Sequence, residues 1–157
     1  MDIEDCITQL EEVFEGEPWY GTSVLKSLEL IPVLFWNKNL ENSSNSIAKL
    51  VYHIIDWRWF IIEKVKNNET FSIELNSEKD WRKNSSVITQ EEKEKCIGEL
   101  IKTQELLCRL VSEKPDSWLY EFAAGKDYSN EYMIRGLLQH DLYHLGQINM
   151  LYSRLKK

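Results

Sequence analysis

The histidines of this chain are the residues whose type and spacing best suit a chemical site. There are three of them, His53, His140 and His144. His140 and His144 are four residues apart, so on an α-helix both imidazoles lie on one face, about 6 Å apart along the axis. Two neutral imidazoles at this spacing can chelate one divalent cation. The same helical stripe is apolar, and polar rings in an apolar interior need partners. This stripe consists of Met133, Leu137, Ile148, Leu151 and Leu155.

The third histidine, His53, lies between Leu50 and Trp57 in another segment with helical apolar spacing. Adjacent helix axes in a bundle are 8–10 Å apart, so His53 can meet the other two over a shared metal. Three histidine ligands leave coordination positions open for water or substrate, as in catalytic sites. Imidazole binds Zn²⁺, Ni²⁺, Fe²⁺ and Mn²⁺, so the sequence does not decide the identity of the metal. The alternative is that the three histidines are hydrogen-bonded core residues.

The segment from His140 to His144 is similar to the His-Glu-x-x-His signature of zinc proteases, but it differs in two respects. Asp141 stands where that signature has its general-base Glu. Residues 145–157 contain no Asp, Glu or His, so no third ligand follows downstream. A metalloprotease is therefore not expected, and a third ligand must come from upstream, where His53 is the obvious candidate.

Polar residues near the histidines are candidates for supporting roles, and no catalytic residue is predicted. Asp56 and Asp141 are the carboxylates that can orient an imidazole through its other ring nitrogen, although Asp56 can equally be a solvated surface group. Gln147 borders the face of the histidine pair and can bind a metal-bound water or bond across the bundle. Four tryptophans can wall a pocket or pack in the core, namely Trp19, Trp57, Trp59 and Trp118.

The apolar periodicity predicts an all-α protein, a four-helix bundle with long crossover loops, in one domain over residues 1–157. Capping residues predict where three helices begin: Ser46 or a polar residue just before it, Thr89 with Glu92, and Ser129. Helical patterns cover residues 2–15, 23–31, 46–66, 89–114 and 129–157, and the expected loops are 37–45, 69–88 and 116–128.

Composition narrows the range of functions. The net charge is −7 and the basic residues are scattered, which argues against binding to nucleic acid or to an anionic membrane surface. No apolar run approaches the ~20 residues of a membrane span, and the acidic N-terminus does not resemble a signal peptide. The cysteines are odd in number and unpaired in spacing, which predicts reduced thiols and a cytoplasmic location. They are Cys6, Cys96 and Cys108.

Two segments together resemble the DinB/YfiT-like metalloenzyme superfamily. Residues 50–58, Leu-Val-Tyr-His-Ile-Ile-Asp-Trp-Arg, resemble its second-helix motif, and residues 140–148, His-Asp-Leu-Tyr-His-Leu-Gly-Gln-Ile, resemble its last-helix motif. The Trp-Tyr-Gly turn at residues 19–21 also resembles the beginning of many members. This resemblance implies an up-down-down-up four-helix bundle, a divalent metal on His53, His140 and His144, and often a homodimer.

The resemblance leads to two functional hypotheses. Characterised relatives include transferases that use low-molecular-weight thiols such as bacillithiol or mycothiol, and a thiol-dependent isomerase. The first hypothesis is therefore a metal-dependent enzyme that activates a small thiol or water against a small-molecule substrate, as in S-transfer or detoxification. The alternative is a non-catalytic dimeric bundle, acting in stress response or partner binding, whose metal is structural.

Overall fold

The protein is all-helical, as predicted. A computed structural model describes residues 1–41 and 45–157, so part of the expected 37–45 loop, residues 42–44, lies outside the described residues. Within the described residues there is no strand and no helix long and apolar enough to cross a membrane. The α-helices are α1 (Ile3–Phe14), α2 (Val24–Leu30), α3 (Ile47–Val65), α4 (Gln90–Ser112) and α5 (Asn130–Leu155), and short 3₁₀ helices cover Val33–Phe35 and Asp116–Tyr120.

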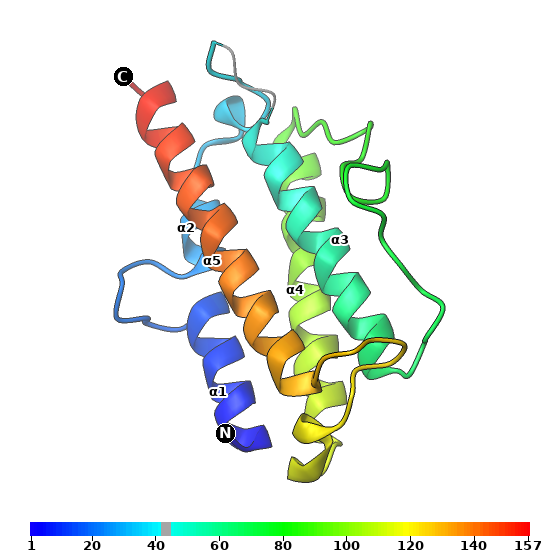
Figure 1. Ribbon diagram of the computed structural model, residues 1–157. Coiled ribbons are helices and arrows are strands. Elements are labelled where there is room, and N and C mark those ends of the chain that lie inside the picture. Colours follow the sequence, from blue (N-terminus) through cyan, green and yellow to red (C-terminus); the bar gives the residue numbers. More distant parts are fainter. Residues whose placement is uncertain (42–44) are drawn as a thin grey trace.

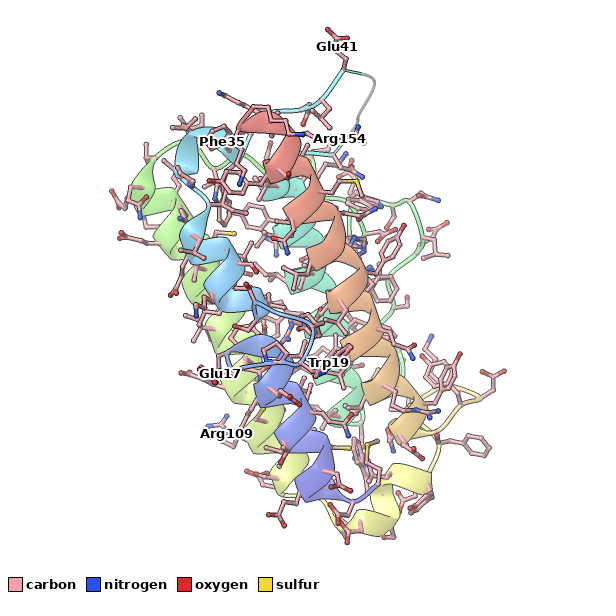
Figure 2. All side chains as sticks on the ribbon, turned by 90° about the vertical axis from the view of Figure 1, so that its left-hand side faces the viewer. Glu17, Trp19, Phe35, Glu41, Arg109 and Arg154 are labelled. Atoms are coloured by element: carbon pink, nitrogen blue, oxygen red, sulfur yellow. The ribbon has the colours of Figure 1, made fainter. Side chains whose placement is uncertain are left out.

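The three long helices α3, α4 and α5 run side by side, with α3 in contact with both of the others (Figure 1). The helices α1 and α2 follow one another along the length of the molecule, as Figure 2 shows, with α1 packed on α4 and α2 on α5. The described residues form five α-helices, one in each of the five segments with a helical pattern, and α1 ends just before Gly16, Glu17 and Pro18. A side chain at Gly16 would approach the Cα of Glu12 to 2.8 Å. The up-down-down-up connectivity stays a prediction.

The helix starts agree with the capping residues predicted from the sequence. The side chain of Ser46 accepts a hydrogen bond from the Lys49 amide at the start of α3. Thr89 and Glu92 form a reciprocal capping box on α4, and the Ser129 side chain caps α5. These bonds satisfy backbone donors that a helix cannot satisfy internally, so they fix where α3 and α5, the helices that carry the histidines, begin.

The core consists of two apolar clusters with a layer of buried polar side chains between them along α3, α4 and α5. One cluster contains, among others, Phe14, Trp36, Ile54, Leu100, Leu145 and Ile148. The other contains, among others, Leu10, Ile62, Leu107, Val111, Ile134 and Leu137. The mid-bundle polar layer consists of His53, Arg58, Gln104, Asp141 and His144, each at most 6% exposed. Polar groups at this depth need partners, so this layer is where a functional site is expected.

Candidate metal centre

The structure brings His53 of α3 together with His140 and His144 of α5. One ring nitrogen of each residue lies within 4.8 Å of those of the other two. The Nε2 atoms of His53 and His140 are 3.1 Å apart. Two imidazole nitrogens bound to one tetrahedral zinc ion at 2.0–2.1 Å lie about 3.3 Å apart, so the spacing of this pair suits a shared divalent cation.

Hydrogen bonds fix the protons of two of these rings on the side away from the cluster. His53 Nδ1 lies 2.7 Å from the backbone carbonyl oxygen of Asp80, and His144 Nδ1 lies 2.7 Å from Gln147 Oε1. Both oxygens can only accept, so each Nδ1 carries a proton and donates it. In the neutral rings, Nε2 then carries no proton, and its lone pair is directed into the cluster. Converging lone pairs repel one another unless a cation or a proton lies between them, so the donor set fits a divalent metal.

Asp80 fixes the His53 ring on the side away from the cluster. It is a buried residue of the 69–88 loop, and it was not among the residues predicted from the sequence. Its Oδ1 lies 3.1 Å from His53 Nδ1 and accepts a bond of 2.9 Å from Trp57 Nε1. Its Oδ2 accepts from the Asn76 amide at 2.7 Å. The next residue, Trp81, stacks on the His53 ring with 3.8 Å between centroids. Asp80 and Trp81 together therefore fix the plane and the tautomer of His53.

The candidate orienting carboxylate Asp56 pairs instead with Arg82. The Arg82 guanidinium binds both Asp56 oxygens at 2.6–3.0 Å and lies 4.7 Å from the Tyr52 ring. The tripeptide Asp-Trp-Arg occurs twice in the sequence, at residues 56–58 and 80–82. The two copies exchange partners, because Asp56 binds Arg82 while Trp57 binds Asp80. That repeat is the one sequence signal from which the role of Asp80 could have been inferred.

The other two supporting candidates lie beside the α5 histidines. Gln147 accepts from His144 and donates to the Tyr143 hydroxyl at 3.3 Å. Asp141 is fully buried and accepts from the Arg58 guanidinium at 2.6 and 3.0 Å. Its second oxygen lies 3.8 Å from His140 Nδ1 and neither atom has a hydrogen-bond partner. Asp141 thus contacts Arg58 directly and lies next to, but not bonded to, the His140 ring.

Burial keeps two of the histidines in the neutral form that binds metal. It lowers the pKa of His144 to about 4, with the neighbouring histidines acting in the same direction. Burial also lowers the pKa of His53 below its ordinary value, although the bond to the Asp80 carbonyl opposes this. A neutral imidazole is the ligand form, so at neutral pH no proton has to leave these rings before a metal binds.

The same pKa shift predicts how the stability of the metal-free protein depends on pH. An unfolded histidine titrates near 6.5, so between pH 6.5 and 4 the unfolded chain binds a proton at residue 144 that the folded protein does not. The free energy of unfolding is therefore expected to fall as pH falls through this range, by at most about 1.4 kcal/mol per pH unit from this residue. Urea unfolding in EDTA at several pH values measures it.

The matched control for this prediction is His144→Gln, which cannot titrate there. Its stability should fall less steeply than that of the wild type between pH 6.5 and 4, and the two curves should run parallel below pH 4. Equal slopes for the two proteins across the whole range would contradict the pKa assigned to His144.

A pocket of about 250 Å³ adjoins the cluster at His140. His140 is the most accessible of the three ligand candidates, with 25% of its side chain exposed. Trp57 contacts both the pocket and the cluster, since it lines the pocket and its ring centroid is 5.8 Å from that of His140. Of the other tryptophans considered, Trp118 is in the core and Trp19 is 99% exposed between α1 and α2 (Figure 2). Small molecules can therefore reach the cluster from the His140 side.

Comparison with known proteins identifies a family. The family model described as the DinB superfamily matches residues 22–148, a range that contains all three histidines and Asp80. No curated protein and no solved structure matches the chain.

Proposed function

Because this chain belongs to the DinB superfamily, we propose that it is a metal-dependent enzyme that joins or transfers a small nucleophile, a low-molecular-weight thiol or water, to a small-molecule substrate. The observation that carries the proposal is the position of His140. This residue is at once one of the three converging ligands and part of the wall of the adjoining pocket. A structural site is closed by protein ligands, whereas a catalytic site keeps a position open toward a cavity.

The residues that would hold the metal are His53, His140 and His144, through their Nε2 atoms. When bound, a divalent cation lowers the pKa of a thiol or water and stabilises the resulting anion as a nucleophile. The chain itself orients the ligands: the backbone carbonyl of Asp80 accepts the Nδ1 proton of His53, and the side-chain carbonyl of Gln147 accepts that of His144. With these two rings held from behind, their lone pairs are already directed into the cluster before any metal arrives.

The nucleophile must come from outside the chain. Burial raises the pKa of Cys6 and Cys108 to about 11 and that of Cys96 to about 12. These thiols stay protonated at neutral pH, and the thiolate is the reactive form. None of the three lines the pocket at His140. The high pKa values and the positions of the three cysteines support an external thiol or water as the attacking group. The identity of the thiol is still a prediction. Formation of a homodimer is also still a prediction.

The proposal is tested with the protein loaded with Co²⁺, whose absorption spectrum reports its ligands. We expect about one bound equivalent, and we expect added bacillithiol or cysteine to produce a sulfur-to-cobalt charge-transfer band. The His140→Ala variant should lose both the stoichiometric binding and the band. A thiol conjugation assay on protein loaded in turn with Zn²⁺, Mn²⁺, Ni²⁺ and Fe²⁺ then tests turnover.

The alternative of a structural metal gives a different result. A closed coordination sphere would bind cobalt with the same stoichiometry, but its spectrum would not change when a thiol is added. That outcome, together with neither thiol-dependent nor hydrolytic turnover for any of Zn²⁺, Mn²⁺, Ni²⁺ or Fe²⁺, would overturn the enzyme proposal in favour of the non-catalytic bundle.

A further inference from the structure

The chemistry of the pocket beside His140 is almost wholly apolar. Its wall contains no Asp, Glu, Lys or Arg, and it consists of Trp57, Phe60, Ile61, Tyr128, Tyr132, Met133, Gly136, Leu137 and His140. The indole nitrogen of Trp57 is engaged with Asp80, so this side chain offers a ligand mainly its ring. A charged molecule entering such a pocket loses its hydration without gaining a partner. The lining therefore favours an uncharged ligand.

Two lysines contact the aromatic wall but do not change this conclusion. The ammonium groups of Lys64 and Lys126 lie 5.5 and 5.3 Å from the centroid of Phe60. Lys64 is buried and donates to the carbonyls of Asn68 and Glu69, so its charge is engaged with the backbone beyond α3. Lys126 is a cation near the pocket that could attract an anion, and comparing an anionic with an uncharged probe tests this.

The volume of the pocket indicates the size of its ligand. A cavity of about 150 Å³ with an apolar lining binds benzene, which has six non-hydrogen atoms. A pocket of about 250 Å³ has room, in proportion, for about ten. This is the size of two fused aromatic rings or of a branched aliphatic chain of similar bulk.

The pocket is kept open at one point by a glycine in the middle of α5. A helix with glycine in its interior is less stable than one with alanine or leucine at the same position, so the presence of Gly136 there needs a reason. A Cβ at Gly136 would meet no atom within 4 Å, so helix packing does not require a glycine. The space that a side chain would fill at this position is the pocket itself, since Gly136 is part of its wall.

We propose that this pocket binds an uncharged, mainly apolar molecule of about ten non-hydrogen atoms as the substrate of the metal centre, and that Gly136 determines the size it accepts. The role as substrate rests on the proposed function, whereas binding does not. A molecule in the pocket lies against His140, with its reactive group toward the converging ring nitrogens, and the aromatic wall shields it from water.

The test uses 2-naphthol, an uncharged bicyclic probe, with binding measured by titration calorimetry on metal-loaded and EDTA-treated protein. We expect it to bind both forms, and naphthalene-2-sulfonate, of the same ring size but charged, to bind at least about tenfold more weakly. The Gly136→Leu variant should raise the dissociation constant of 2-naphthol at least about tenfold, because the new side chain occupies the pocket.

The matched control is Gly98→Leu on α4. Gly98 also has nothing within 4 Å of a Cβ, but it is exposed and does not line this pocket. Both variants should fold and retain metal, and only Gly136→Leu should lose the probe. Unchanged affinity in Gly136→Leu, or sulfonate binding as tight as that of 2-naphthol, would overturn the proposal.

The two proposals fail in distinguishable ways. If 2-naphthol binds and is lost in Gly136→Leu, but no metal binds under any loading condition, the enzyme proposal fails and the apolar binding site stands. If cobalt and thiol bind as expected but 2-naphthol does not, the pocket proposal fails and the metal centre stands.

Discussion

Replacing His53 with alanine is expected to lower the affinity of the protein for Zn²⁺ by roughly a hundred- to a thousandfold. A four-ligand zinc site binds with about 10–16 kcal/mol, so one ligand contributes on average about 2.5–4 kcal/mol. The remaining pair, His140 and His144, can chelate a metal but cannot reproduce the cross-helix site, because the variant lacks the ligand atom from α3, the His53 Nε2 that lies 3.1 Å from His140 Nε2. Competition with a chromophoric chelator, followed by elemental analysis, measures the loss.

Graded variants separate a ligand from a residue that orients one. Asp80→Asn should weaken binding by about tenfold at most, the lower end of the effects seen for groups that orient metal-bound histidines, because the backbone carbonyl of residue 80 still accepts the His53 Nδ1 proton. Asp127→Asn, which removes a carboxylate from an exposed position in the 116–128 loop, should leave the affinity unchanged. If His53→Ala bound zinc as tightly as the wild type, the convergence of the three rings would have no role in metal binding.

Helical periodicity explains why the ligand set could be anticipated while its support could not. The phase of His140 and His144 on α5, and of His53 on α3, follows from local backbone geometry and the apolar residues beside them. Asp80 and Trp81 lie in a loop without periodicity, so their contact with His53 depends on how the 69–88 segment folds back over α3. The bond from Arg82 to Asp56 is part of that folding, and only the repeated Asp-Trp-Arg hints at it.

The partner of Asp141 was equally hidden from the sequence. Asp141 is one residue after His140 and therefore about 100° further around α5, which turns it away from the cluster and toward the bundle interior. There it meets Arg58, five residues after His53 on α3. Neither the depth of a residue nor its partner on another helix can be read from one segment, because both depend on how α3, α4 and α5 pack.

The buried Arg58–Asp141 pair gives the largest stability effect expected in this chain. Both side chains are fully buried, and the guanidinium also donates to Gln104 at 2.8 Å and lies 4.8 Å from the Phe14 ring. Removing one partner leaves an uncompensated charge in the core, so Asp141→Leu is expected to lower the free energy of unfolding by about 3–5 kcal/mol. Urea unfolding in EDTA measures this without a contribution from bound metal.

A double-mutant cycle distinguishes the lost charge partner from lost packing. Arg58→Met should be destabilising by itself. The double variant Arg58→Met with Asp141→Leu should lose much less free energy of unfolding than the two single variants lose together, since no unpaired charge remains. Glu91→Ala, which breaks an exposed ion pair with Lys95, should leave the unfolding midpoint unchanged. Additive losses in the cycle would mean that the two charges do not depend on each other. The mid-bundle polar layer would then stabilise the fold through packing alone, and the position of Asp141 beside His140 would need another explanation.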